Sequence, residues 1–264
     1  MSKKGVIKIE IKIDDLNINY IKQGKGNNVL IVPGWGAPIN TYMTLFNSIS
    51  KYACCYVLDM PGVGDSDEPK KSWDVNDYVD FLKKFIKALE LKELSLIGHS
   101  NGGRVIIKMM SEHPTEFKVN KIILMGSAGI KNKRTFKQNC KVYTYKFGKK
   151  ILSLKLVKKI WPDAIENFKK NAGSEDYRNS TPIMRETMVK LINTDLTDDL
   201  HKIEQPTLII WGEKDTAEKI QNGELMEKLI PDAGLVKIED GSHFVFLEKT
   251  GYVNLVIKTF LEQK

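Results

Sequence analysis

A serine flanked by glycines stands where a buried strand should turn into a helix. Gly98–Gly102 reads Gly-His-Ser-Asn-Gly, with Ser100 at its centre. The preceding apolar run Leu94–Ile97 predicts a buried strand, and Gly103–Met110 has the period of a helix. Such a turn projects the serine hydroxyl at a helix N-terminus, where developing negative charge is favoured. The pattern predicts a nucleophile at Ser100. The alternative is a glycine-rich turn that contains an incidental serine.

A serine nucleophile needs a general base, and the chain has four histidines. His243 follows the last predicted strand, at the strand edge where Ser100 is also expected, and this shared edge favours it as the base over a surface role. His99 lies beside the serine and is expected to point away from it as a structural residue. A helix-capping role is expected for His113, and a surface position for His201.

The acid that orients the histidine is expected between nucleophile and base in chain order. Asp215 follows the apolar run Leu208–Trp211 after a short loop and is the candidate. Glu213 is the competitor, but it stands closer to the end of the predicted strand. The segment Gly126–Gly129, which follows another predicted strand, contains no acid.

Two backbone N–H groups are expected to stabilise an oxyanion beside this serine. One belongs to Asn101, the residue after the nucleophile, and the other to Trp35 in the turn Pro33–Gly36. Gly34 allows that turn to approach closely. Three residues are expected to line a substrate pocket: Gly34, Trp161 and Phe244.

The elements that must position these residues follow a strand–helix rhythm. Val6–Asp14 and Asn17–Ile21 alternate apolar and polar residues and predict an antiparallel hairpin. Continuous apolar runs, typical of strands buried on both faces, follow at Val29–Val32, Cys54–Leu58, Leu94–Ile97, Ile122–Met125, Thr207–Trp211 and, more weakly, Leu235–Ile238. Helical periods occur at Tyr42–Ser50, Tyr78–Leu89, Gly102–Ser111, Glu224–Leu229 and Tyr252–Leu261. This alternation predicts an α/β protein with a parallel sheet wrapped by helices.

The rhythm breaks once, because no strand-like run occurs between residues 129 and 200. We therefore expect a core formed by 1–128 and 201–264, with a helical insertion at 129–200. The insertion holds 16 of the 41 basic and 8 of the 33 acidic residues, so the rest of the chain carries 25 of each. Positive charge is thus concentrated in the insertion.

The segment Lys131–Lys159 has eleven basic residues and no acid. It is interpreted in three ways: a solvated face, a docking surface for an acidic partner or anionic substrate such as an acyl carrier protein, or a membrane-surface helix over Lys149–Trp161. Nucleic acid is the least favoured partner, because no recognition motif is present.

Other chemistries lack their motifs. The sequence has no complete dinucleotide fingerprint, P-loop, C-x-x-C or H-E-x-x-H, so no metal and no organic cofactor is expected. Its apolar stretches all fall short of the ~20 residues that span a bilayer. Met1–Glu10 lacks the apolar core of a signal peptide. With three cysteines, a disulfide framework is not expected, and a cytoplasmic location is the simplest interpretation.

Several of these motifs together resemble the α/β-hydrolase superfamily, in its serine-nucleophile branch with a helical cap. They are Gly98–Gly103, Asp59–Ser66, Gly212–Asp215, Gly241–His243 and Phe246–Glu248. The resemblance implies a mostly parallel sheet of about eight strands, a structural role for Asp59–Ser66, and the insertion as a cap. It also implies a Ser100–His243–Asp215 triad that works through an acyl-enzyme.

Within the superfamily, the chain resembles carboxylesterases and meta-cleavage-product hydrolases. The Gly-Trp-Gly turn is similar to the carboxylesterase of biotin synthesis, although many relatives have a histidine where Pro33 stands. Serine at position 100 argues against haloalkane dehalogenases and epoxide hydrolases. The expected substrate is a small carboxylic ester, with a thioester, lactone or carbon–carbon bond as variants. The alternatives are a small-molecule receptor with little turnover and an esterase for acyl-carrier-protein-bound esters.

Overall fold

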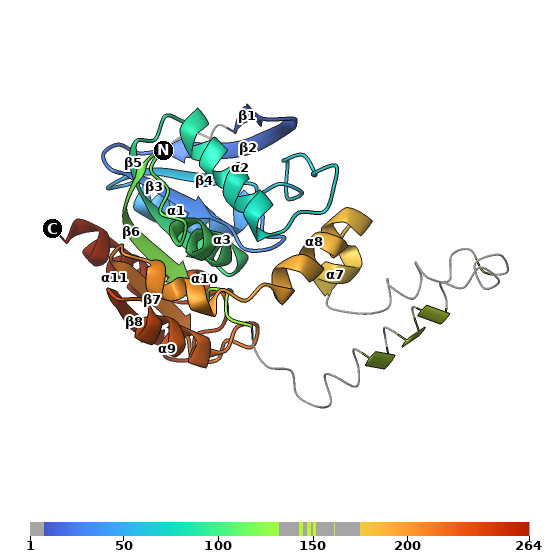
Figure 1. Cartoon of the computed structure of the whole chain (residues 1–264). Helices are drawn as coiled ribbons and strands as arrows, with labels where there is room; N and C mark the ends of the chain where they lie inside the picture. The colour runs from blue at the N-terminus through green and yellow to red at the C-terminus, as the bar shows by residue number, and fades with distance from the viewer. Residues whose placement is uncertain are drawn as a thin grey trace.

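The computed structural model describes residues 8–131, 143–144, 147–148, 150–151, 161 and 175–263. In this part of the chain, eight strands form one sheet in the order β1-β2-β4-β3-β5-β6-β7-β8 (Figure 1). The strands are β1 (Ile9–Ile13), β2 (Leu16–Gln23), β3 (Asn28–Val32), β4 (Cys54–Leu58), β5 (Glu93–His99), β6 (Lys118–Met125), β7 (Thr207–Gly212) and β8 (Ala233–Ile238).

Only β2 runs against its neighbours in this sheet. It pairs antiparallel with β1, with Ile9 opposite Tyr20, and antiparallel with β4, while all the other strand pairs are parallel. The tight turn of the β1–β2 hairpin includes Asp14, whose φ is 50°. The predicted hairpin and the mostly parallel sheet of about eight strands are both confirmed.

The strand order reverses its direction at β3. The chain leaves β3 for β4 on one side and then returns to β5 on the other side, so β3 lies between them. The connections after β3 and β5 therefore diverge at the carboxyl ends of these strands, which is where open α/β sheets bind their ligands. The turn with Trp35 and the turn with Ser100 follow these two strand ends.

Helices cover both faces of the sheet. One apolar cluster joins α2 (Val75–Ala88), α3 (Asn101–Met110) and α9 (Ile220–Leu229) to the sheet, and another joins α1 (Met43–Ile49), α10 (Val245–Glu248) and α11 (Thr250–Glu262). Strand β3 contributes to both clusters, because Leu30 packs with the first and Ile31 with the second. This two-sided burial explains why its sequence is a continuous apolar run.

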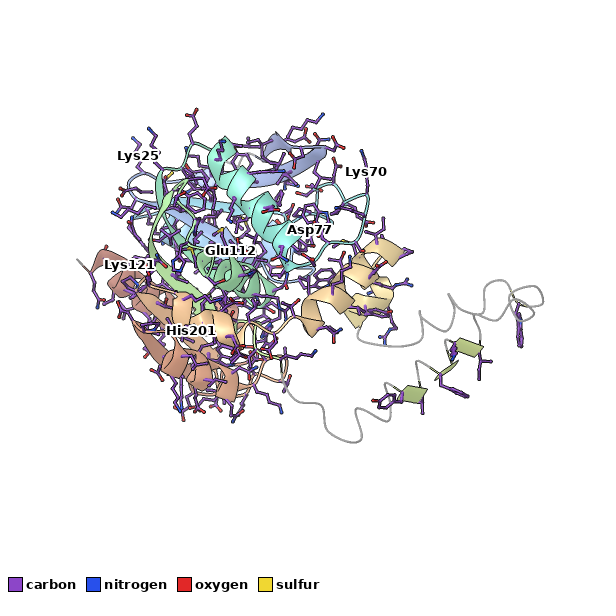
Figure 2. The ribbon with its side chains drawn as sticks, viewed as in Figure 1. Lys25, Lys70, Asp77, Glu112, Lys121 and His201 are labelled. Carbon is purple, nitrogen blue, oxygen red and sulfur yellow. The ribbon has the colours of Figure 1, made fainter. Side chains whose placement is uncertain are left out.

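Helix α2 begins earlier than the sequence period indicated. The predicted start was Tyr78, but the helix begins at Val75 because Asp74 and Asp77 form a reciprocal capping box. In the second half of this helix, Lys83 contacts Glu112, which also pairs with Lys108 and so joins α2 to the end of α3. Glu112 is labelled in Figure 2.

The described end of the insertion is helical and packs on the loop before α2. It comprises α7 (Glu175–Asn179), α8 (Pro182–Asn193) and the short 3-10 helix η2 (Thr197–Lys202). Thr187 accepts a hydrogen bond from the Trp73 N–H at 2.9 Å, and Lys190 donates to Ser72. Half of the insertion lies outside the described residues, and the boundaries 129 and 200 stay a prediction. Among the helices described, none combines the length and apolar character needed to cross a bilayer.

The packing of α3 against β3 generates a first prediction, because it leaves no room for a side chain at Gly102. A Cβ there would lie 2.0 Å from the Val32 carbonyl oxygen, which is backbone and has little freedom to move. We expect Gly102→Ala to lower the free energy of unfolding by about 3 kcal/mol, the range of overpacking in a rigid core.

The matched control is Gly234→Ala in β8, where an added Cβ meets no atom within 4 Å. It should leave the stability unchanged or raise it slightly, since glycine is unfavourable within a strand. Urea unfolding of both variants measures the difference. Equal stability of the two variants would contradict the packing argument.

Candidate active site

Ser100 occupies a strained turn between β5 and α3. Its backbone has φ 51° and ψ −117°, a region that residues with a Cβ avoid at a cost of about 1–3 kcal/mol. The turn is held by hydrogen bonds from the Ser100 N–H to the Met125 carbonyl and from the Ala128 N–H to the Ser100 carbonyl, both 3.0 Å. The serine side chain makes no capping bond to the helix, so the hydroxyl is not occupied by α3.

Asp215 and His243 are in direct contact. Asp215 Oδ2 lies 2.7 Å from His243 Nδ1, and the aspartate side chain is fully buried while that of the histidine is 15% exposed. Asp215 Oδ1 accepts hydrogen bonds from the N–H groups of Ala217 and Glu218 at 2.8 and 2.9 Å. Because a carboxylate only accepts, His243 Nδ1 carries a proton, and the lone pair of the neutral ring is on Nε2.

The loops that carry these two residues are joined through their backbones. The Lys214 N–H donates to the Gly241 carbonyl at 2.8 Å and so links the two loops. Within the loop of His243, the Ser242 N–H donates to the Glu248 side chain. Glu213, the competing acid, is exposed, and its N–H donates to the carbonyl at the end of β8. The geometry therefore pairs the histidine with Asp215 and not with Glu213.

Gly126 connects this pair to the serine turn. A Cβ on Gly126 would lie 3.1 Å from Asp215 Oδ2 and 3.2 Å from His243 Nδ1, so the pair packs directly on its backbone. The residue before it accepts the hydrogen bond from the Ser100 N–H. Within the described residues the Ser100 hydroxyl forms no hydrogen bond to His243, so the contact expected for a working triad stays a prediction.

The turn after β3 approaches Ser100 closely. A Cβ on Gly34 would lie 3.2 Å from the Ser100 Cβ, which is why only glycine fits there without displacement. The Gly34 N–H donates to the Tyr42 hydroxyl at 2.7 Å and is therefore occupied. Asn101 is the first residue of α3, so its N–H has no carbonyl one turn earlier in the helix.

Asp59 holds the far end of this turn. It is 2% exposed, and Oδ1 accepts from the Ile39 N–H at 2.7 Å while Oδ2 accepts from Asn19 at 2.7 Å and from the Asp65 N–H at 3.1 Å. Ser66 donates to the Asp59 carbonyl at 2.7 Å. These contacts give Asp59–Ser66 the structural role that the sequence predicts.

His99 is buried, and it also connects two loops of the site. Its Nδ1 lies 2.9 Å from the Tyr42 hydroxyl and its Nε2 lies 3.0 Å from the His243 carbonyl. Burial, and secondarily the neighbouring His243, lowers the pKa of His99 to about 3, so the ring is neutral. The sequence predicted a structural histidine here but gave no indication of Tyr42, which lies in the helical run after the turn.

A second group of residues that sequence reasoning missed lies beside Asp215. Arg104 is 7% exposed and donates to the Asn101 side chain at 2.8 Å, while no partner for its Nε is found among the described residues. Glu218 accepts from Asn222 at 3.3 Å. Burial raises the pKa of Glu218 to about 7, although the Arg104 charge opposes that rise. The sequence signal that could have indicated this group is Arg104 itself, a charged residue in the first turn of the helix that follows Ser100.

The remaining sequence candidates fall in different environments. Phe244 is 37% exposed and its ring centroid lies 5.3 Å from that of His243, so it borders the site. Trp161 is 70% exposed, its neighbours in sequence lie outside the described residues, and its pocket role stays a prediction. His201 is exposed in η2, as expected (Figure 2), while His113 has φ 51° and faces Glu204 at 3.9 Å.

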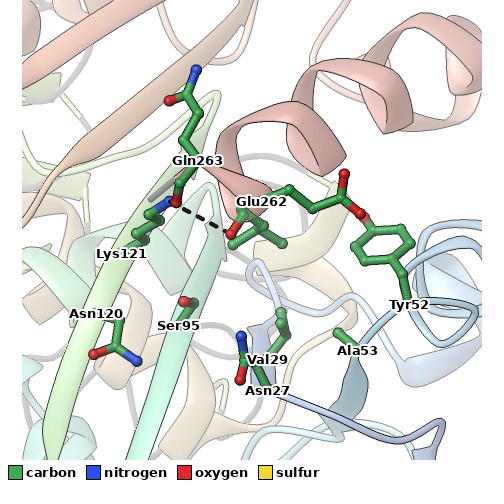
Figure 3. Close-up of a pocket in the computed structure, with 10 residues that line it drawn as sticks. Asn27, Val29, Tyr52, Ala53, Ser95, Asn120, Lys121, Glu262 and Gln263 are labelled. Atoms are coloured by element: carbon green, nitrogen blue, oxygen red, sulfur yellow. Dashed lines mark hydrogen bonds between the residues drawn. The ribbon is translucent and has the colours of Figure 1, made fainter.

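Two cavities lie at opposite edges of the sheet. One of about 340 Å³ adjoins the turn after β3 and the described end of the insertion, and its lining includes Trp35, Val63, Glu68 and Met184. Another of about 460 Å³ lies near the amino ends of β3, β5 and β6, with Tyr52, Ser95 and Lys121 in its wall (Figure 3). This second cavity is remote from Ser100, which follows the carboxyl end of β5. No cluster of three metal-binding side chains occurs in the part of the chain that the structure describes.

Glu218 generates a prediction of pH dependence. Its pKa is raised from 4.5 in the unfolded chain to about 7 in the folded protein, so the folded state binds more protons between these values. Stability from this group is therefore fully present below about pH 4.5 and is lost as the pH rises toward 7. We expect Glu218→Gln to stabilise the protein relative to the wild type at about pH 8 by more than at low pH.

Urea unfolding at both pH values measures this difference, with Glu213→Gln in the exposed part of the same loop as control. A Glu218→Gln variant whose stability relative to wild type does not change with pH would show that the carboxyl is not held protonated by burial.

Comparison with known proteins agrees with this fold. A family model described as alpha/beta hydrolase fold matches residues 27–139 and 142–250. The AB hydrolase superfamily protein YisY of Bacillus subtilis is 27% identical over 256 residues, which cover 90% of this chain and 92% of that protein. The 2-hydroxy-6-oxo-2,4-heptadienoate hydrolase of Pseudomonas putida is 23% identical and 91% of each chain is covered.

Among solved structures, an esterase from Exiguobacterium antarcticum matches with a TM-score of 0.76 and 21% identity, covering 97% of this chain and all of that one. At such identity, the structural likeness supports the fold. Because the family model covers most of the chain, the chain belongs to the alpha/beta hydrolase fold family.

Proposed function

We propose that this protein is a serine hydrolase that cleaves a small carboxylic ester through an acyl-enzyme. The observation that carries the proposal is the contact between Asp215 Oδ2 and His243 Nδ1, 2.7 Å long and buried beside the strained turn of Ser100. This contact fixes the proton on Nδ1, so Nε2 is the nitrogen that accepts a proton. A histidine with this tautomer, at the same edge of the sheet as a serine whose hydroxyl has no hydrogen bond among the described residues, fits the requirements of nucleophilic catalysis.

In the proposed reaction, Ser100 Oγ attacks the ester carbonyl while His243 Nε2 takes the hydroxyl proton. The N–H groups of Trp35 and Asn101 stabilise the negative charge on the carbonyl oxygen. His243 then gives its proton to the leaving alcohol, and the acyl group stays on the serine. Water, deprotonated by the same histidine, releases the acid and restores the hydroxyl.

The cavity beside the oxyanion turn supports a small substrate. Its volume of about 340 Å³ is near the lower end of small-molecule sites. Trp35, Val63 and Met184 give it an apolar wall, while Glu68 and Thr181 add a polar side. Thioesters, lactones and carbon–carbon bonds activated by a carbonyl are variants of the same chemistry. The Pseudomonas putida relative is named as a hydrolase of a dienoate, which favours keeping carbon–carbon bond cleavage among the variants.

Two alternatives follow from the sequence. A receptor of the same fold would bind a small molecule with little turnover. An esterase for carrier-bound esters would use the basic segment 131–159 as a docking surface for an acidic partner in the cytoplasm, and most of that segment lies outside the described residues. Turnover of free p-nitrophenyl esters separates the receptor from both enzymes, and preference for a carrier-bound ester separates the enzymes.

Active-site labelling tests the proposal directly. A fluorophosphonate should label the wild type at one residue, and Ser100→Ala should remain unlabelled, because only the activated serine reacts. The control is Ser127→Ala, since Ser127 follows the neighbouring strand β6 and its hydroxyl is buried and donates to the Ala128 carbonyl. This control should keep the label. Labelling that persists in Ser100→Ala would overturn the assignment of the nucleophile.

The acid should matter less than the nucleophile. We expect Asp215→Asn to lower kcat on p-nitrophenyl acetate by about 10⁴-fold and Ser100→Ala by about 10⁶-fold, since the acid orients and stabilises the base without forming bonds to the substrate. Glu213→Asn is the matched control and should retain kcat. An equal loss of kcat in Asp215→Asn and Glu213→Asn would show that Asp215 is not the orienting acid.

A further inference from the structure

We propose that Tyr42 and His99 form a positioning pair that ties the oxyanion turn to the loop of the catalytic base. The pair joins the Gly34 N–H at one end to the His243 carbonyl at the other. Its hydrogen bonds end on backbone groups and not on the reacting atoms, so its role is to hold two parts of the site in register. This inference rests on the proposed function, because it assigns Trp35 and His243 their roles in ester cleavage.

The direction of every hydrogen bond in the pair follows from its ends. The His243 carbonyl only accepts, so His99 Nε2 carries the proton and donates across 3.0 Å. His99 Nδ1 then accepts from the Tyr42 hydroxyl across 2.9 Å. Because that hydroxyl donates to the ring, its oxygen is left to accept from the Gly34 N–H across 2.7 Å. Each donor and acceptor in this series of hydrogen bonds has one assignment, so the series has one arrangement.

Packing leaves the pair little freedom to rearrange. Tyr42 is 0% exposed and His99 is 1% exposed. The Tyr42 ring stacks on Phe246 at 5.3 Å between centroids, and the His99 ring lies 5.1 Å from those of both Phe244 and Phe246. Burial also lowers the pKa of His99 to about 3 and raises that of Tyr42, so both stay neutral at physiological pH.

The pair acts on two features that the reaction needs. At one end it engages the Gly34 N–H, which leaves the next amide, that of Trp35, as the donor for the oxyanion. At the other end it holds the backbone of His243, whose ring is already oriented by Asp215. The base thus has two anchors of different kinds, one that sets its ring and tautomer and one that sets its distance from the oxyanion turn.

The decisive variant is Tyr42→Phe, which keeps the buried ring and removes only the hydroxyl. It leaves the Gly34 N–H and His99 Nδ1 without partners, so the two loops are no longer joined. We expect kcat on p-nitrophenyl acetate to fall about tenfold with KM within about twofold of wild type, as expected for lost transition-state alignment. The ¹⁵N resonance of His99 Nδ1 should move toward the value of an unbonded imidazole nitrogen.

Two control variants separate positioning from stability. Tyr52→Phe removes a buried tyrosine hydroxyl that has no hydrogen-bond partner among the described residues, and it should leave kcat unchanged. Ile49→Val trims a fully buried side chain in the same apolar cluster as Tyr42 without touching a polar group. It should lower the urea midpoint while preserving kcat, which shows that a loss of core stability does not by itself reproduce the effect.

His99 variants test the other end of the pair. His99→Gln retains an N–H donor near the position of Nε2, whereas His99→Leu has none. We expect the glutamine variant to keep more of the wild-type kcat than the leucine variant. If both fail to fold, the comparison of Tyr42→Phe with Ile49→Val still decides the question.

The outcomes distinguish this inference from the proposed function. A wild type that is labelled by fluorophosphonate, with Tyr42→Phe equal to it in kcat or no slower than Ile49→Val, would overturn the positioning role alone. A wild type that neither takes the label nor cleaves esters would overturn the proposed function and the positioning role with it. A fall in kcat confined to Tyr42→Phe and the His99 variants, with KM preserved, supports both.

Discussion

The backbone at Ser100 passes through a conformation that a serine avoids, and the neighbouring segments have to hold it there. Strain of about 1–3 kcal/mol persists only where surrounding contacts over-determine the residue. Here the constraint comes from the sheet itself, because the Ser100 N–H bonds to the end of β6 and its carbonyl accepts from Ala128 beyond that strand. The close approach of α3 to β3 at Gly102 restrains the Ser100 turn from its other side. The serine side chain is not used as a helix cap, so its hydroxyl stays available at this turn.

The other residues of the site are brought together at the same edge of the sheet, where its parallel strands end. Parallel strands place their carboxyl ends together, so β3, β5, β6, β7 and β8 deliver their loops to one side of the sheet. Asp215 and His243, although 28 residues apart, meet because β7 and β8 are neighbours and their loops share backbone hydrogen bonds. Gly126, after β6, then gives the pair a surface with no side chain to displace it.

Sequence patterns were sufficient for the sheet because strands buried on both faces have a continuous apolar run. The choice of Asp215 as the orienting acid stays a prediction, while in the structure Asp215, and not the exposed Glu213, contacts His243. Sequence patterns failed where a role depends on contact between distant segments. Tyr42 lies in an ordinary helical period, and nothing in that period indicates that its hydroxyl meets His99, 57 residues away. Glu218 and Arg104 were not predicted for the same reason. The raised pKa of Glu218 depends on its burial and on the nearby Arg104 charge, which no local sequence pattern shows. The early start of α2 at Val75 was missed since a capping box, not an apolar period, sets that end.

The two anchors of His243 address two separate degrees of freedom. Asp215 acts on the ring through a side-chain hydrogen bond, which selects the tautomer and the rotation of the imidazole. His99 acts on the backbone carbonyl of the same residue, which fixes where the ring begins. An ionised anchor at the second position would place another charge next to the base and alter its affinity for protons. A neutral imidazole, kept neutral by burial, holds the loop without adding charge to the site. In the proposed mechanism His243 exchanges protons, and a neutral His99 holds its backbone without placing a charge beside it.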